Sequence, residues 1–219
     1  MTNDEYYCSI EEMKNQFKSL RKEGLEIFRG IIGRNLLDED LFFIASLDRC
    51  LRLIDGMNNM LENRNLTCAG AILRLQMDNC MRTYAAYIAA DRKKVVNCLL
   101  EGNPINKEKD INGKKLSDGH LKDEVSKLDN QFKTVYDQAS GFIHLSEKAF
   151  YQTIADVDDG KIIIQIGCDL PEKRNEPLLE CAEAFLHFVK LHYSMLYPVV
   201  DSKTRYEKER QELRNKSDC

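Results

Sequence analysis

The sequence predicts an all-α protein, a single bundle of about five or six helices with one small β-hairpin. Apolar residues recur at helical spacing through most of the 219 residues, and the chain is 43% hydrophobic and 31% charged, with only four Pro. These proportions are typical of a helical globular protein rather than a disordered chain or a β-sandwich. Because no segment resembles an interdomain linker, we expect one domain over residues 1–200 and a charged C-terminal tail at 201–219.

Four helices are predicted in the first half of the chain from helical apolar spacing, over residues 4–32, 39–61, 68–90 and 91–100. Asp38 and Thr67 precede the second and third of these helices and are expected to be their caps. The third helix is apolar around most of its circumference. We therefore expect it to be the central helix of the fold.

The middle of the chain predicts a loop followed by a long helix. Turn formers and lysines fill residues 103–117, which are typical of a surface loop, and Ser117 or Asp118 is the expected cap of the next helix. From Leu121 to Phe142, apolar residues alternate steps of four and three. This is the most regular helical pattern in the chain, and it predicts one continuous helix.

The last third predicts a hairpin and a final helix. β-prone segments within about 150–167 are joined across residues 158–160, where a glycine accepts the positive φ of a hairpin turn. An amphipathic helix is predicted over 178–197 and is expected to end at Pro198. The charged tail after it is expected to be either solvated helix or disordered.

Charge and cysteine spacing exclude several classes of protein. The net charge of −4 provides no global field that attracts nucleic acid or acidic membranes. No apolar run has the length of a membrane span, and the acidic, amphipathic N-terminus does not resemble a secretory signal. The eight Cys include no CxxC or zinc-knuckle spacing. We expect a cytoplasmic protein with free thiols, no cofactor and no metal.

Three polar residues late in the long helix form the first candidate site. Tyr136, Ser140 and His144 follow one another at i, i+4 and i+8, so they share one row of the helix. The row drifts away from the apolar stripe, which would leave the imidazole of His144 available as an acid or base near neutral pH. The alternative is that the three side chains satisfy one another's hydrogen bonds at a packed helix end.

Charged residues on the apolar central helix form the second candidate site. Arg74 and Asp78 are separated by four positions, and Arg82 follows one turn later. A charge in such a helix needs a partner. One interpretation is an internal ion pair that orients neighbouring helices. The other is that Arg74 faces His144 and binds a phosphate or carboxylate.

Basic residues are concentrated in the short fourth helix and the loop after it. They are Arg92, Lys93, Lys94, Lys107, Lys109, Lys114 and Lys115. They predict either a patch that contacts the phosphates of RNA or a solvated loop. Acidic residues dilute the cluster, and no aromatic residues are interleaved with it to stack on bases.

Common catalytic and nucleotide-binding motifs are absent. The sequence contains no GxxxxGK[ST], GxGxxG, GxSxG, HExxH or EF-hand pattern. His187 and His192 are five positions apart, so they do not share a helix face as metal ligands at i, i+4 would. They are interpreted as ordinary helix residues.

The order of three features carries a family resemblance. They are an Arg-bearing apolar helix at 69–90, a GxPINKxKD loop at 102–110, and a helix that ends Tyr136-Asp-Gln-Ala-Ser140-Gly-Phe-Ile-His144. Over roughly residues 40–155 the chain resembles a group of uncharacterised bacterial helical proteins. More distantly, it resembles the HEPN superfamily of nucleotide-directed helical bundles.

The HEPN resemblance implies a four- or five-helix bundle that often forms a homodimer and belongs to an antiviral or toxin system. In active members it implies metal-independent RNA cleavage by a His and an Arg that shortly precedes it on the same helix. His144 matches the His, whereas Asp137, Gln138 and Ala139 stand where the Arg would be. Arg74, on another helix, would have to supply the missing cation.

Three functions follow from these observations. The first is a binding or accessory module that dimerises or docks on a protein partner without chemistry of its own. The second is a ribonuclease in which His144 moves a proton, Tyr136 and Ser140 orient it, and Arg74 stabilises the phosphorane. The third is a nucleotide or small-molecule sensor with a cleft between the central helix and the hairpin.

Overall fold

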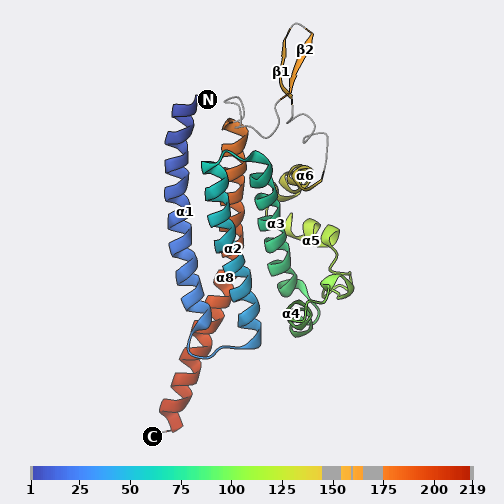
Figure 1. Ribbon diagram of the computed structural model, residues 1–219. Coiled ribbons are helices and arrows are strands. Elements are labelled where there is room, and N and C mark those ends of the chain that lie inside the picture. The colour runs from blue at the N-terminus through green and yellow to red at the C-terminus, as the bar shows by residue number, and fades with distance from the viewer. Residues whose placement is uncertain (1, 145–153, 159, 165–174, 218–219) are drawn as a thin grey trace.

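The computed structural model describes residues 2–144, 154–158, 160–164 and 175–217, and it is mostly helical (Figure 1). The α-helices of the described residues are α1 (Asn3–Ile32), α2 (Asp38–Glu62), α3 (Leu66–Ile88), α4 (Arg92–Leu100), α5 (Asp118–Val125), α6 (Phe132–Ile143) and α8 (Asn175–Ser217). A short 3-10 helix, η1 (Ile105–Lys107), follows α4. The prediction of an all-α chain is confirmed at this level.

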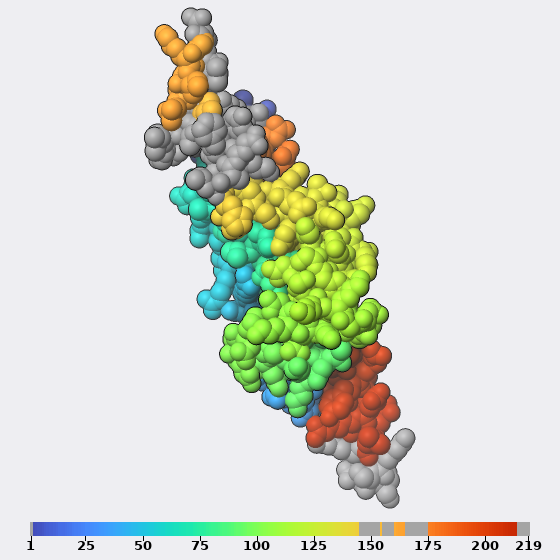
Figure 2. Space-filling model, turned by 90° about the vertical axis from the view of Figure 1, so that its right-hand side faces the viewer, coloured from blue at the N-terminus to red at the C-terminus, as the bar shows by residue number. Residues whose placement is uncertain are grey.

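Four long helices, α1, α2, α3 and α8, lie side by side around the main core, and the shorter α4, α5 and α6 cover the outer side of α3 (Figures 1 and 2). Helix α3 contacts α2, α4, α5, α6 and α8, which confirms that it is the central helix. Along it the buried residues include Ala69, Ala85 and Ala86, whose small side chains let neighbouring helices approach closely. Within the described residues, no helix combines the length and the apolar character needed to cross a membrane.

Helix starts lie close to their predicted positions, but two predicted caps are wrong. Asn65, rather than Thr67, caps α3, and its side-chain oxygen accepts a hydrogen bond from the main-chain N of Cys68 at 3.0 Å. Asp38 is the first residue of α2 rather than its cap. Ser117 caps α5 as predicted. Asn and Thr are both good capping residues, so the sequence favours neither strongly.

The predicted single helix over 121–142 is wrong, because the chain forms α5 and α6 with a turn between them. Asp129 fixes this turn. Its Oδ1 accepts a hydrogen bond from the main-chain N of Gln131 at 3.0 Å, and its Oδ2 lies 2.5 Å from Nε2 of His187 on α8. Leu128, which the pattern places in the apolar stripe, is exposed. The apolar spacing therefore continues across a break that a tertiary contact stabilises.

The predicted helix end at Pro198 is also wrong, because α8 continues through Pro198 to Ser217. Proline removes one main-chain hydrogen bond from a helix, so neighbouring contacts must stabilise this turn. The Tyr87 hydroxyl donates to the main-chain oxygen of Met195 just before the proline. Just after it, Val200 packs so closely on α1 that a Cβ at Gly30 would lie 2.6 Å from Val200 Cγ1. The charged tail thus begins as helix.

The hairpin consists of β1 (Ile154–Asp158) and β2 (Lys161–Ile164), which pair antiparallel and project away from the helices (Figure 1). Gly160 has a φ of 72°, which suits a glycine at the turn. Both strands lie inside the predicted range of 150–167. Apart from Gly160, the other residues of that range lie outside the described chain.

Candidate functional site

Tyr136 and Ser140, the first two residues of the long-helix row, lie on α6, which packs on α3. Gly70 permits this close packing, because a Cβ at its position would collide with the ring of Phe142. Ala139, one turn before, is buried in the same contact. This packing places Tyr136 directly over Arg74. We call the set Gly70, Arg74, Tyr136 and Ser140 the α3–α6 seam.

Arg74 contacts Tyr136, and no contact joins it to His144 in the described chain. Its guanidinium carbon lies 3.7 Å from the centre of the Tyr136 ring, and its Nη2 donates to the tyrosine hydroxyl. A second cation, the Lys122 ammonium, lies 5.2 Å from the same ring centre. Burial raises the pKa of Tyr136, and the positive charge of Arg74 offsets part of that rise. The tyrosine is therefore a neutral hydrogen-bond partner at physiological pH.

The other two members of the row are not joined to each other. The Ser140 hydroxyl donates to the main-chain oxygen of Tyr136 at 2.8 Å, a local bond within the helix. His144 is the C-cap of α6, is exposed, and makes no hydrogen bond or ion pair with other residues of the described chain. It lies eight residues beyond Tyr136, about 12 Å along a helix axis. The structure thus brings Arg74 and Tyr136 together, gives Ser140 a bond within its own helix, and leaves His144 without a partner in the described chain.

The charges of the central helix form an interhelical network that excludes Arg74. The Asp78 carboxylate lies 3.6 Å from the guanidinium nitrogens of both Arg49 on α2 and Arg82 on α3. Arg82 also contacts Asp118 of α5 at 2.6 Å. These groups are all partly exposed, so each pair contributes little stability. Asp78 and Arg82 thus form an ion pair that links neighbouring helices, as the first interpretation expects, but the pair is partly exposed and Arg74 is not part of it.

The predicted basic patch spans the start of α4 and the loop after it. Its exposed members in the loop are Lys107, Lys109, Lys114 and Lys115. Lys94 pairs with Glu108 at 2.8 Å, and Arg92 points away from the patch into a cleft described below. No contact among the described residues distinguishes phosphate binding from solvation of these lysines, so RNA binding by this patch stays a prediction.

Asp110 organises this loop, although the sequence indicated it only as a diluting negative charge. Its Oδ1 accepts hydrogen bonds from the main-chain N of Asn112 at 2.9 Å and of Lys114 at 2.8 Å. Its Oδ2 lies 2.8 Å from Nε2 of His120. Burial alone would raise the pKa of Asp110, but the hydrogen bonds from Lys114, His120 and Asn112 outweigh it and hold the pKa below its usual range.

A polar cluster inside the core was missed, because His192 was interpreted as an ordinary helix residue. Its Nε2 lies 2.6 Å from the Ser46 hydroxyl and 3.1 Å from that of Thr83, while the two hydroxyls are 2.7 Å apart. A serine beside a histidine suggests a nucleophile and a base. His192 is however 0% exposed, and burial lowers its pKa to about 3. No substrate reaches it, so this cluster is structural.

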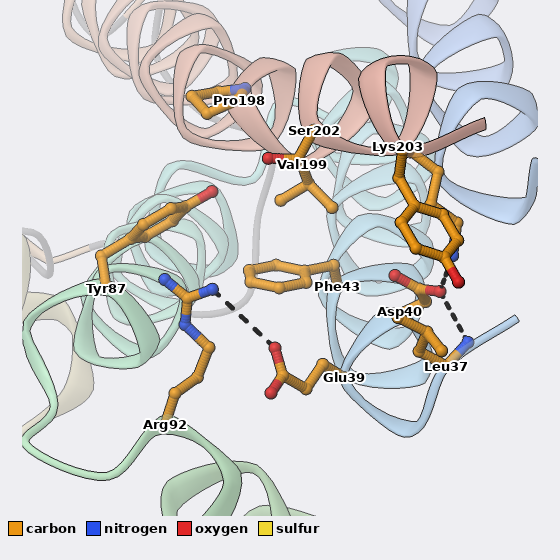
Figure 3. A pocket seen from close by; sticks show the side chains of 11 residues that line it. Leu37, Glu39, Asp40, Phe43, Tyr87, Arg92, Pro198, Val199, Ser202 and Lys203 are labelled. Atoms are coloured by element: carbon orange, nitrogen blue, oxygen red, sulfur yellow. Dashed lines mark hydrogen bonds and ion pairs between the residues drawn. The ribbon is translucent and has the colours of Figure 1, made fainter. Parts of the chain in front are cut away.

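A cleft with a volume of about 300 Å³ lies at the end of the bundle where α2 begins (Figure 3). It is lined by the start of α2, the α3–α4 junction and the part of α8 after Pro198, among others by Glu39, Phe43, Tyr87, Arg92, Val199 and Tyr206. We call it the base cleft. One wall contains an ion pair between Asp40 and Lys203, which are only 4% and 7% exposed. The cleft that the sequence places between the central helix and the hairpin borders residues outside the described chain.

Comparisons of this chain with protein-family models, with curated proteins and with solved structures found no match. The HEPN resemblance therefore stays an expectation from the sequence. The geometry of the α3–α6 seam and of the base cleft is the basis for the proposals below.

Proposed function

We propose that this chain is a HEPN-like helical binding or accessory module, of the kind that serves bacterial defence or toxin-type systems, without chemistry of its own. One observation carries the proposal: the polar groups of the α3–α6 seam already bond to one another. The Tyr136 hydroxyl accepts from Arg74, and the Ser140 hydroxyl donates to the Tyr136 main chain. A general acid or base needs its partners within hydrogen-bond reach of the reacting group, and His144 has none among the described residues.

The ribonuclease alternative requires a cation beside His144. Arg74 has no carboxylate partner in the described chain, so it carries a charge that a phosphate would attract. To lie beside His144, however, Arg74 would have to give up its contacts with both the ring face and the hydroxyl of Tyr136. This cost favours the binding module.

The partner that we propose for the module is a second copy of the chain, docked along the end of α8. Beyond the base cleft this helix extends past the bundle, as Figures 1 and 2 show. Tyr206 and Leu213 are exposed on it and are seven residues apart, so they share one face. In an antiparallel pair of these helices, each Tyr206 lies level with Leu213 of the second copy. Such a contact is self-complementary and closes as a dimer.

Sedimentation velocity over a wide range of protein concentrations tests this assembly. We expect the wild type to dimerise and Leu213→Glu to be monomeric, because the substitution places a charge in the proposed contact. Leu100→Glu, which changes another exposed leucine at the end of α4, is the matched control and should dimerise like the wild type. A wild type that stays monomeric throughout would contradict self-docking through α8.

A further inference from the structure

The base cleft combines a pre-oriented guanidinium with apolar and aromatic walls. Its volume of about 300 Å³ is at the lower end of the range for small-molecule sites. Three parts of the chain that are distant in sequence converge on it, and Figure 3 shows the Arg92 side chain reaching into it between Tyr87 and Phe43.

Two contacts hold Arg92 in place without occupying the end of its side chain. Nε donates to the main-chain oxygen of Ala86 at 2.9 Å, and the guanidinium carbon lies 5.4 Å from the centre of the Tyr87 ring. Its nearest carboxylate is that of Glu39, at 3.8 Å from Nη1. This distance is too long for a hydrogen bond. Both terminal nitrogens of Arg92 therefore remain available as donors.

Glu39 is a weak competitor for those donors. Its side chain and that of Arg92 are 39% and 43% exposed, so solvent screens their attraction. An incoming carboxylate or phosphate can accept two parallel hydrogen bonds from the guanidinium, a geometry that Glu39 does not achieve here. The second cation of the cleft, Lys203, is already neutralised by the buried Asp40.

The remaining walls suit a flat ring. The side chains of Phe43, Tyr87, Val199 and Tyr206 line the cleft, and they supply an aromatic and aliphatic surface beside the guanidinium. An oxyanion alone would leave this surface in contact with water, whereas a ring attached to the oxyanion would cover it.

We propose that the base cleft binds a small aromatic oxyanion, whose carboxylate or phosphate is held by Arg92 and whose ring packs on Tyr87 and Val199. Aromatic carboxylates and nucleoside monophosphates share this chemistry. Val199 belongs to α8 after Pro198, whereas Tyr87 belongs to α3, so the ligand bridges the bundle and the end of α8.

Titrations followed by NMR and calorimetry test the site with three probes: 3-phenylpropionate, 5′-AMP and inorganic phosphate. From typical ligand efficiencies, a probe of the size of 3-phenylpropionate that fits should bind with a Kd on the order of 1 mM, and the larger 5′-AMP should bind more tightly if it fits as well. We expect saturable binding of at least one ring-bearing probe, and which of them binds tighter identifies carboxylate or nucleotide as the ligand. Arg92→Gln should weaken that binding about tenfold or more, because it removes charge-assisted hydrogen bonds.

Two further variants complete the test. Lys93→Gln makes the same change of charge at the adjacent, exposed position and should bind like the wild type. Ser202→Phe fills the cleft and leaves Arg92 intact, so it should abolish binding even if Arg92→Gln proves to be unstable. Three results would overturn the proposal. They are no saturable binding of either ring-bearing probe, unaltered binding by Ser202→Phe, and inorganic phosphate binding as tightly as 3-phenylpropionate and 5′-AMP. These outcomes do not depend on His144 or Leu213. A negative result here therefore contradicts the ligand site alone, and a monomeric wild type contradicts the self-docking alone.

Discussion

The buried His192 makes stability depend on pH in a way that can be measured on the folded chain. Its ring is fully buried between α2, α3 and α8, and burial lowers its pKa to about 3 from an ordinary value near 6.5. Above pH 6.5 the imidazole is neutral in both the folded and the unfolded chain. Between pH 6.5 and about 3, the unfolded chain binds a proton that the folded chain does not. The free energy of unfolding therefore falls as the pH falls through this window.

The magnitude follows from the linkage of one proton. Each pH unit below the unfolded pKa costs about 1.4 kcal/mol, so the loss between pH 7.5 and pH 5 is about 2 kcal/mol. This value changes little for any folded pKa below about 4, because at pH 5 such a group is still almost wholly neutral in the folded chain. Against a total stability of roughly 5–15 kcal/mol, a loss of this size is readily detected.

Urea unfolding followed by circular dichroism, at a series of pH values, measures this loss. His192→Gln keeps an amide near Ser46 but cannot titrate, so the curve of its stability against pH should be flatter than that of the wild type by about 2 kcal/mol at pH 5. His187→Gln, on the same helix but partly exposed, is the control and should retain the part of the slope that comes from His192. Parallel curves for the wild type and His192→Gln would show that His192 does not cause the pH dependence.

Three further predictions concern packing and buried charge. Gly70→Ala should destabilise the fold by about 1–3 kcal/mol, because its Cβ collides with Phe142, whereas Gly119→Ala, with open space around it in α5, should be neutral or stabilising in the same urea assay. Lys203→Met should cost about 3–5 kcal/mol, because it leaves the buried Asp40 carboxylate without its partner, and Lys203→Met combined with Asp40→Asn should recover part of that loss in thermal melts. Asp110→Asn should speed amide hydrogen exchange at Ala90 and Ile111, whose main-chain hydrogen bonds join the loop to the end of α3. In the wild type, the protection of these amides should fall only when the pH falls through the lowered pKa of Asp110. Unchanged exchange in Asp110→Asn would count against the role of this carboxylate.

Sequence patterns determined most of the helices, because burial on one face imposes a period that is visible locally. The central position of α3 follows from apolar residues around most of its circumference. The two errors in helix length have tertiary causes. At Pro198 the helix persists because Tyr87 and Gly30, from two other helices, support the turns on either side. At Asp129 the helix breaks because His187 on α8 fixes the turn.

The sites were less predictable than the fold, because their members come from distant segments. Ser46, Thr83 and His192 meet on three helices, and no local spacing indicates that they do. The base cleft likewise joins Glu39, Arg92 and Val199. Tyr136 and Ser140 lie one turn apart on α6, as the predicted row requires. Helix α6 ends at Ile143, so His144 does not continue the row.

We propose that the chain is a protein-binding module that does not cleave RNA, and an RNA-cleavage assay distinguishes this proposal from the ribonuclease alternative. Purified wild type and His144→Ala are incubated with single-stranded and structured RNA in EDTA, since the described residues contain no group of metal-binding side chains and HEPN-type cleavage is metal-independent. We expect intact RNA with both proteins. We also expect the two to unfold within about 0.5 kcal/mol of each other, because His144 is exposed and has no partner in the described chain. EDTA-resistant cleavage by the wild type that His144→Ala abolishes would contradict the proposal.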